Sequence, residues 1–502
     1  MKVIKPNTIA YPDGSFSRGT IGTYFNKTGV MQTAAIDEPR FTYNPTTLKF
    51  EGLLLEPAIY NLLLYSEDFT NANWVKTGTT VTSNTTVAPD GTTTADTITA
   101  TNIDIRQSLG TPLAGNLTFS IYLKGSGTVY IRLQGANISP TAAQTVVLTS
   151  NWVRYSVSLE FLTYYGNVLA DIINLDSSSP VVYAWGAQLE LSSVATSYIK
   201  TTAAQTLRNT DVVTGTGLIY TTATDPNPVY SSGTTYAVNA IVRYNSMLYQ
   251  SLQSANINHQ PDTSSTWWIE LYSDNMHAAF DNQTSTATSG TTSITFVVKA
   301  GSFDTTALIN LEASLAELAV SDYASKTLIY SNSIGLAEGT IQDWYQYFFN
   351  DPLVHRTQAV FYGVPPYTEA VATLRLTGST GDIVSVAQAI FGTVAELGGT
   401  QYGAQAGITD YSVKETDAFG TTTFTKRAFS KRLTADLYLT TAELNRVQNF
   451  LYNIRATPTV WIASDDPLLE EASVIWGFYR DFSTSISYPS HALCNIQIEG
   501  LT

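Results

Sequence analysis

The sequence has little charge, one cysteine and four histidines, and each shortage excludes a class of protein. Charged residues are 13% of the 502, and 26 Lys and Arg stand against 41 Asp and Glu, a net charge of −15. A chain this acidic lacks the basic surface that nucleic-acid binding requires. The single Cys494 cannot form an internal disulfide or a cysteine-rich zinc site. The four histidines are scattered, without metal-ligand spacing: His259, His277, His355 and His491.

The sequence also lacks a long apolar run. The longest apolar stretches, Gly52–Leu55 and Asn61–Tyr65, are far shorter than the roughly 20 residues with which a helix crosses a membrane. Residues Met1–Gly14 do not contain the apolar core of a secretion signal. We therefore expect a chain without a membrane span that is made and folded in a reducing cytoplasm.

What is abundant favours β-structure. Hydrophobic residues reach 44%, enough for several cores, and aromatics reach 12%, with 30 Tyr. Tyr, Val, Ile and Thr favour strands, and Thr, Ser, Asn and Gln take the place of the missing charge. At roughly 150 residues per domain the length suggests about three to four domains. The composition predicts a mainly β, multidomain protein with an uncharged polar surface.

Changes of pattern along the chain predict four parts. The first is an N-terminal arm that carries assembly contacts, and the second is a β-sandwich of jelly-roll type. A small aromatic-rich β module and a β-rich C-terminal domain with one or two helices follow. The predicted boundaries are 1–66, 67–205, 225–272 and 274–502.

Alternation identifies the sandwich strands. In Leu117–Leu123, Val129–Leu133 and Trp152–Leu159 every second residue is apolar, which places the apolar residues on one face of each strand. Strands at this spacing, separated by Gly and Asn turns, are typical of a β-sandwich.

One helix of the C-terminal domain is clear in the sequence. Thr440 and Glu443 have the spacing of a capping box. One apolar face follows, formed by Leu444, Val447, Leu451 and Ile454. A second helix is predicted over 382–397. The chain is expected to end on strands at 475–482 and 493–498.

Several stretches resemble phage proteins. Ser15–Phe25 (SFSRGTIGTYF), Gly29–Ala35 and Gly52–Pro57 resemble an N-terminal segment of phage tail and virion proteins. Glu67–Trp74 (EDFTNANW) and Trp185–Glu190 (WGAQLE) resemble the opening and closing strands of a carbohydrate-binding-like jelly roll in the same proteins.

The short third part is similar to the chitin-binding module of bacterial chitinases. The residues that match that pattern are Tyr236, Val242, Tyr244, Tyr249, Pro261 and Trp267. The sequence departs from it where Asn239 replaces a Gly and where Asn245-Ser246 replaces an Asn-Gly turn.

The resemblance implies sugar recognition by aromatic faces. The glycan-binding candidates are Tyr236, Tyr244, Tyr249, Trp267 and Trp268. Adjacent tryptophans on a strand point in opposite directions, so we expect one in the core and one exposed. The alternative is that so small a domain uses all its aromatics as core.

The C-terminal part looks like a domain of tailed-phage proteins encoded near the tail tip. The resemblance rests on Asp343–Phe349 (DWYQYFF), Val364–Tyr367, Trp476–Phe482 and Ile498–Thr502. It implies a structural component of the virion tail, at the tip, baseplate or fibre attachment. The expected partners are other tail proteins and further copies of the chain, with a host-surface glycan as a possible ligand.

Other candidate residues lie in the jelly roll. Trp74, Trp152 and Trp185 alternate with apolar residues and are expected in the core. The weaker sugar-face candidates are Tyr122, Tyr130, Tyr164 and Tyr165. Sandwiches of this type often hold a structural Ca²⁺, to which Glu67, Asp68 and Asp96 could contribute oxygens, although their spacing is not diagnostic. No other cofactor is expected.

No catalytic constellation is recognisable. The adjacent carboxylates Asp37-Glu38, Asp465-Asp466 and Glu470-Glu471 do not predict a pair that faces a glycosidic bond. There is no Gly-x-Ser-x-Gly motif and no phosphate-binding loop. The sequence therefore favours a non-enzymatic virion protein. A glycan-degrading tail depolymerase is the alternative, and a secreted polysaccharide-binding protein is the third hypothesis.

Overall fold

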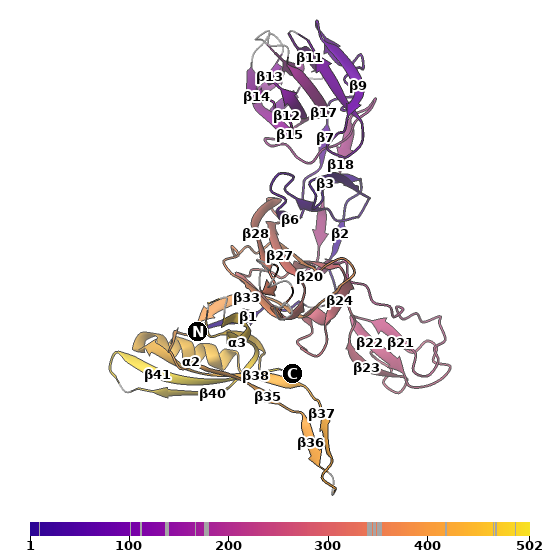
Figure 1. Cartoon of the computed structure of the whole chain (residues 1–502). Coiled ribbons are helices and arrows are strands. Elements are labelled where there is room, and N and C mark those ends of the chain that lie inside the picture. The colour runs from indigo at the N-terminus through magenta and orange to yellow at the C-terminus, as the bar shows by residue number, and fades with distance from the viewer. Residues whose placement is uncertain are drawn as a thin grey trace. The chain divides into compact units, whose positions relative to one another are not determined.

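The computed structural model describes residues 1–502 except 10, 101, 111–112, 136–139, 166, 175–179, 339–343, 345–347, 349–353, 417–418, 465, 467–468, 487 and 502. The chain divides into two compact units (Figure 1). Phe16–Val213 form what we name the sandwich unit, and Met1–Ser15 with Thr214–Thr502 form the large unit. Both are built mainly of antiparallel strands, so the predicted mainly β, multidomain class is confirmed.

The sandwich unit contains two five-stranded sheets. One has the order β15 (Val153–Tyr165), β12 (Leu113–Ser126), β17 (Val181–Glu190), β10 (Ala95–Thr99) and β9 (Thr80–Thr86). The other has the order β14 (Thr141–Val147), β13 (Thr128–Gly135), β16 (Val168–Ile173), β11 (Asp104–Leu109) and β8 (Val75–Lys76).

The core of this unit follows from the alternation in the sequence. Leu117, Phe119, Ile121 and Leu123 of β12 are all fully buried in one cluster with Ile131 of β13. Since residues two apart lie on the same face of a strand, each sheet contributes one apolar face to this core. The predicted β-sandwich is confirmed.

Short strand pairs extend the sandwich unit. They are β3 (Gly22–Phe25) with β4 (Met31–Ala34), β5 (Phe41–Tyr43) with β6 (Phe50–Leu53), and β7 (Ile59–Asn61) with β18 (Thr206–Arg208). The chain passes from one unit to the other within β2 (Ser15–Ser17) and at the end of β19 (Val212–Thr214).

A buried ionic cluster holds these pairs to the chain segment near residue 210. Asp211 binds Arg18 (3.3 Å) and Arg40 (2.6 Å), and Glu56 binds Arg40 (2.7 Å) and Arg208 (3.0 Å). All five residues are buried. Because an unpaired charge is costly in the interior, their mutual pairing is what makes this burial tolerable.

The large unit contains an eleven-stranded sheet that curls into a half-barrel. Its main order is β31 (Gln358–Phe361), β26 (Thr305–Glu312), β33 (Ile383–Glu396), β1 (Lys2–Pro6), β39 (Thr459–Ile462), β40 (Val474–Ser485), β41 (His491–Gly500), β38 (Phe429–Thr440) and β34 (Gly399–Thr400). In addition, β24 (Thr288–Thr291) pairs with β33, and β35 (Gln405–Asp410) pairs with β38.

The large unit also contains a five-stranded sheet, which supplies much of a separate hydrophobic core. Its order is β20 (Gly217–Thr221), β25 (Ser293–Lys299), β32 (Ala370–Thr377), β27 (Leu315–Asp322) and β28 (Thr327–Gly335). Smaller elements are β29 (Ala337–Glu338) with β30 (Val354–His355), β36 (Val413–Thr416) with β37 (Thr422–Thr425), and the 3₁₀ helix η2 (Ala278–Phe280).

The first predicted helix is confirmed. Helix α2 (Thr441–Asn453) begins after Thr440, and the Glu443 carboxylate accepts hydrogen bonds from the Thr440 N–H (3.2 Å) and hydroxyl (2.7 Å). Leu444, Val447 and Leu451 are buried against the eleven-stranded sheet. None of the described helices is long and apolar enough to cross a membrane.

The helix predicted over 382–397 is wrong, because Ile383–Glu396 is strand β33. This strand lies inside the sheet, paired with β26 and β1, and both of its faces are buried along Ala387–Phe391. A strand buried on both faces has no polar side, so its pattern is not distinct from that of a buried helix. Helix α3 (Glu470–Ser473) also lies within the described part of the chain.

The two faces of the eleven-stranded sheet carry different cores. In β39, Trp461 packs in the cluster beneath α2, whereas Val460 and Ile462 belong to a separate cluster with Ile309 and Trp476. Since neighbouring residues of a strand point to opposite faces, this second cluster lies on the face away from α2.

Candidate functional site

The aromatic module, residues 225–273, is a small three-stranded sheet. Its strands are β21 (Ile241–Tyr244), β22 (Met247–Ser251) and β23 (Trp268–Ser273). The β21–β22 hairpin turns at Asn245 (φ 48°) and Ser246 (φ 67°), and Asn239 also has a positive φ of 66°. The departures from the chitin-binding pattern therefore fall on left-handed backbone positions, where glycine is favoured and Asn is tolerated.

Three of the five predicted aromatics form the core of the module. Tyr236, Tyr249 and Trp268 are 8%, 5% and 2% exposed. Trp268 Nε1 donates a hydrogen bond to the His259 carbonyl (2.8 Å), and the Tyr249 hydroxyl donates to Glu270 Oε2 (3.1 Å). Burial and the neighbouring Glu270 carboxylate raise the pKa of Tyr249 to about 12. These three rings support the module and are not available for stacking on a sugar.

Tyr244 and Trp267 are half-buried. The sequence predicted that one of the adjacent tryptophans is core and the other exposed; Trp268 takes the core position and Trp267 the more exposed one. The Tyr230 and Tyr244 rings are nearly perpendicular, with centroids 5.8 Å apart. The Trp267 indole stacks on the His259 imidazole, with centroids 3.8 Å apart and planes 11° apart.

Hydrogen bonds fix the loop that carries this stack. The buried Asn256 accepts a bond from His259 Nδ1 (3.0 Å) and donates one to the Trp267 carbonyl (3.3 Å). The Leu252 N–H also bonds to the Trp267 carbonyl (2.9 Å), and Gln253 Nε2 bonds to the Thr266 carbonyl (2.9 Å). We name the surface formed by Trp267, His259, Leu252 and Gln253 the Trp267 platform.

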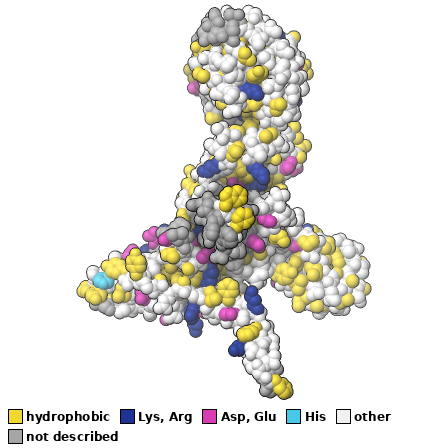
Figure 2. All heavy atoms as spheres, viewed as in Figure 1, with side chains coloured by type: hydrophobic (Ala, Val, Ile, Leu, Met, Phe, Trp, Pro, Cys, Tyr) yellow, Lys and Arg dark blue, Asp and Glu magenta, His cyan; other side chains and the backbone are white. Residues whose placement is uncertain are grey.

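The surface of the module is apolar and nearly uncharged. Figure 2 shows hydrophobic side chains gathered over the visible face of the lobe that carries β21–β23 in Figure 1. Leu252, Ile257, Ile269 and Tyr272 are each 45–47% exposed. Residues 225–273 contain four charged side chains in the sequence: Asp225, Arg243, Asp262 and Glu270.

The jelly-roll aromatics mostly lie in cores. Trp74 and Trp185 are buried, as predicted, whereas Trp152 is half-buried. Trp152 Nε1 donates to the Val87 carbonyl (2.8 Å), and Lys124 Nζ lies 4.9 Å from the centroid of the Trp152 ring.

The four tyrosine candidates of the sandwich differ in exposure, and two of them can be placed. Tyr122 is buried, and Tyr130 is half-buried on β13. The side chains of Tyr164 and Tyr165 lie outside the described part of the chain.

The carboxylates considered for Ca²⁺ bind protein groups. Glu67 accepts from the Tyr198 hydroxyl (3.0 Å) and Lys200 Nζ (2.6 Å). Asp96 accepts from the backbone N–H groups of Phe69 (2.8 Å) and Asn84 (2.9 Å). Asp68 accepts from Thr70 in a local turn. Among the described residues, no group of three or more potential ligands could hold a metal ion.

The adjacent carboxylates also have structural partners. Asp37 accepts from the Arg18 N–H (2.9 Å) and Glu38 from the Ala35 N–H (2.7 Å). Glu470 pairs with Arg356, and Glu471 accepts from the Thr357 hydroxyl (2.8 Å). Asp465 lies outside the described residues, as does most of the 343–349 motif.

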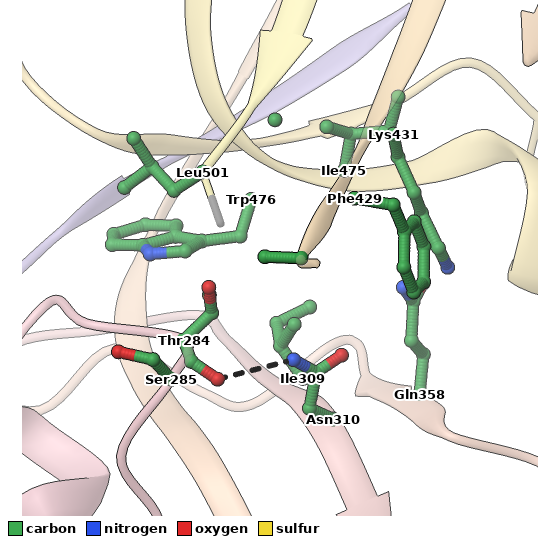
Figure 3. A pocket seen from close by; sticks show the side chains of 12 residues that line it. Thr284, Ser285, Ile309, Asn310, Gln358, Phe429, Lys431, Ile475, Trp476 and Leu501 are labelled. Atoms are coloured by element: carbon green, nitrogen blue, oxygen red, sulfur yellow. Dashed lines mark hydrogen bonds between the residues drawn. The ribbon is translucent and has the colours of Figure 1, made fainter. Parts of the chain in front are cut away.

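A cavity that the sequence did not predict lies in the large unit (Figure 3). Its volume is about 210 Å³. The curl of the sheet brings Ile309 of β26 and Gln358 of β31 close to Phe429 of β38 and Trp476 of β40. Strands β26 and β31 are neighbours in the sheet, but three or more strands separate them from β40 and β38, so no local motif could have identified the cavity.

Some polar groups that line the cavity have hydrogen-bond partners and others have none among the described residues. Lys431 Nζ donates to the Glu471 carbonyl (2.8 Å), and Asn310 Nδ2 donates to the Thr284 carbonyl (3.4 Å). Trp476 Nε1 and Gln358 Oε1 are buried without a hydrogen-bond partner among the described residues. Such atoms are uncommon in folded proteins, because an unmade buried hydrogen bond costs about 1–3 kcal/mol.

Comparisons with known proteins give matches at the level of structure. No family model and no curated protein matches the sequence. A solved structure of the enzymatically active domain of tailspike protein 4 from bacteriophage CBA120 is similar to 26% of this chain, at 13% identity and a TM-score of 0.23. The match covers 21% of that tailspike chain.

Carbohydrate-binding modules are also among the similar structures. A variant of a family 29 module matches 27% of this chain and 91% of its own, at 14% identity and a TM-score of 0.20. A family 61 module in complex with β-1,4-galactotriose matches 25% of this chain and 95% of its own, at 13% identity and a TM-score of 0.21.

Proposed function

We propose that the protein is a structural component of a phage tail that recognises a host-surface glycan through the Trp267 platform of its aromatic module. The single observation that carries the glycan proposal is the half-buried Trp267, stacked on His259 and surrounded by apolar and neutral polar side chains. A pyranose presents a C–H face that packs on an aromatic ring, and its hydroxyls need neutral hydrogen-bond partners. The platform supplies both kinds of contact.

The rigidity of the platform supports this proposal. Asn256 and Trp268 are buried and both hold His259 in place. Asn256 accepts a hydrogen bond from His259 Nδ1, and Trp268 Nε1 donates one to the His259 carbonyl. A surface ordered before binding loses less conformational entropy when it meets a ligand. Low affinity per site is compensated if several copies of the chain are present in one particle.

The test uses the full chain and the N-acetylglucosamine tetramer, because the module resembles chitin-binding modules. Isothermal titration is expected to show binding that Trp267→Ala weakens at least about 10-fold, the equivalent of about 1.4 kcal/mol. Tyr272→Ala is the matched control, since Tyr272 is an exposed aromatic of the same module. Equal losses in both variants, or no binding by the parent chain, would overturn the assignment to the platform.

The tail context rests on the sequence motifs of the N-terminal and C-terminal parts. We place the chain in the virion, assembled with other tail proteins and with copies of itself. Immunogold labelling of particles with an antibody against the module tests this placement. Labelled tail ends support it, and particles that lack the chain contradict it.

The proposed role is binding, not hydrolysis. The carboxylates of Asp37, Glu38, Glu470 and Glu471 are bonded to backbone, hydroxyl or basic groups of the fold. Release of reducing sugar from host polysaccharide by the purified chain would instead establish the depolymerase alternative.

A further inference from the structure

The hairpin formed by β36 and β37 stands apart from the hydrophobic cores of the large unit. The two strands pair with each other and with no other described strand, and each described residue of 414–429 is exposed. Figure 1 shows the hairpin continuing away from β35 and β38. We name residues 413–427 the hairpin arm. A two-stranded hairpin alone is at best marginally stable in water, so a partner that covers the arm would stabilise it.

The side chains of the arm suit a protein surface of opposite charge. Phe419 and Phe424 are 94% and 72% exposed, and exposed apolar side chains that gather in one place mark interaction sites. Lys414, Lys426 and Arg427 are exposed as well. Figure 2 shows a hydrophobic side chain at the end of the arm and Lys or Arg side chains along it. The arm has three cations against two carboxylates in a chain that carries −15, so it is a locally positive segment of an acidic protein.

An open groove of the same unit has the size to hold an aromatic ring. Its volume is about 420 Å³. We name it the Tyr402 groove, and the residues that border it include Tyr402, Ala404, Ala406, Leu433, Leu469 and Ala472. The three alanines are exposed, so the walls of the groove are accessible. An engineered protein cavity of roughly 150 Å³ binds benzene, and the Tyr402 groove therefore has room for a phenylalanine side chain.

One wall of the groove is acidic. Residues 463–473 (ASDDPLLEEAS) contain four carboxylates and no cation. Glu470 and Glu471 are paired with Arg356 and Lys431, whereas the Asp466 side chain is exposed. The hairpin arm and this wall have opposite charges, and charge complementarity of this kind steers two surfaces together and selects the partner.

We propose that the hairpin arm of one copy docks in the Tyr402 groove of a second copy, with the Phe419 ring inside the groove. The arm does not fill the groove of its own chain, because Ala406 lies near the start of β35 and the arm begins beyond the far end of that strand, after Asp410. This contact rests on the self-assembly proposed above and assigns its surface, and it is independent of the Trp267 platform. A contact between two different surfaces of one chain builds a ring if its rotation closes, and a filament if it does not.

The experiment is sedimentation velocity of the full chain and its variants. The parent chain is expected to associate in the micromolar range, and less tightly as the NaCl concentration rises. Phe419→Ala removes the ring from the arm, and Ala406→Trp fills the groove from an exposed position of β35. Each should weaken association at least about 10-fold. Tyr452→Ala is the matched control and should associate like the parent, since Tyr452 is a 67% exposed aromatic of α2.

A mixture of the two variants tests the pairing directly. The Phe419→Ala chain keeps an intact groove, and the Ala406→Trp chain keeps an intact arm. The mixture should therefore form one-to-one complexes that neither variant forms alone, which also shows that both variants are folded. If the mixture does not associate, or if both variants associate like the parent, the arm and the groove are not partners and the proposal fails.

The remaining outcomes separate this proposal from the proposed function. A parent chain that stays monomeric at the highest concentration reached would overturn both the docking and the proposed self-assembly. If the monomer instead binds phosphatidylglycerol vesicles and Phe419→Ala removes that binding, the arm contacts a membrane and the docking proposal is wrong. Binding of the N-acetylglucosamine tetramer should be equal in the parent and in Phe419→Ala, because the platform does not include the arm.

Discussion

Glu56 provides the sharpest test of how the sandwich unit is stabilised. It is buried and receives hydrogen bonds from Ser197 as well as ion pairs from Arg40 and Arg208. Burial opposes ionisation of the Glu56 carboxyl, but Arg208, Arg40 and Ser197 outweigh it and lower its pKa from 4.5 to about 2. The substitution to test is Glu56→Gln, which keeps the shape and removes the charge.

The size of the effect follows from the pKa. A fall from 4.5 to about 2 corresponds to about 3 kcal/mol of folding free energy at about 1.36 kcal/mol per pKa unit. Because the pKa is lower in the folded state, this stabilisation is fully present above pH 4.5 and is lost as the pH falls toward 2. Breaking a buried pair costs about 3–5 kcal/mol in other proteins, in the same range.

Hydrogen exchange in urea, followed by mass spectrometry, measures the free energy of unfolding of the sandwich unit from its own peptides. Glu56→Gln should lower it by about 3 kcal/mol at pH 7 and by less than half of that near pH 3. Glu160→Gln is the control, since Glu160 is exposed on β15 of the same unit. A cost below about 1 kcal/mol at pH 7, or an equal cost at both pH values, would refute the stabilising role of the ionic cluster.

Three further predictions concern the large unit. Ser246→Gly should stabilise the aromatic module by up to about 1 kcal/mol, because Ser246 has a φ of 67°; an unchanged or lower melting temperature would contradict this. Burial lowers the pKa of His277, but hydrogen bonds to Asp13 and Asp274 outweigh it and raise the pKa from 6.5 to about 9. Protonated His277 therefore stabilises the fold fully below pH 6.5, and this stabilisation is lost as the pH rises through about 9; His277→Asn should remove this alkaline loss from urea titrations, and an identical pH profile would contradict the contribution. Leu451→Ala should lower the free energy of unfolding in urea by about 2–5 kcal/mol, because Leu451 is buried between α2 and the eleven-stranded sheet. A loss below about 1 kcal/mol would mean that α2 contributes little to the core.

Local patterns predicted the elements in which apolar and polar residues follow a clear period. In β12 the polar Thr118 and Ser120 alternate with apolar residues, although both faces of the strand are buried, and in α2 the apolar residues form one stripe. Strand β33 was assigned to a helix because both of its buried faces carry apolar residues, which leaves no alternation to define the period.

The sites were harder to predict than the strands. Composition placed five aromatics in the module, but which of them form its core depends on packing. The different exposure of Trp267 and Trp268 agrees with the prediction, but Trp267 lies in the turn before β23, so strand alternation is not its cause. The cavity that joins Gln358, Phe429 and Trp476 depends on the curl of a sheet, which no local pattern encodes. No sequence pattern marked Arg18, Arg40 and Arg208 as buried.

The most direct test of the central claim is a nitrogen–proton NMR spectrum of the full chain, which contains eight Trp. Each indole N–H gives one signal, assigned by single Trp→Phe substitutions. Addition of the N-acetylglucosamine tetramer should shift the Trp267 signal and leave those of the core residues Trp74 and Trp185 in place. An unmoved Trp267 signal, with the glycan bound or shifting only signals of the sandwich unit, would contradict recognition at the Trp267 platform.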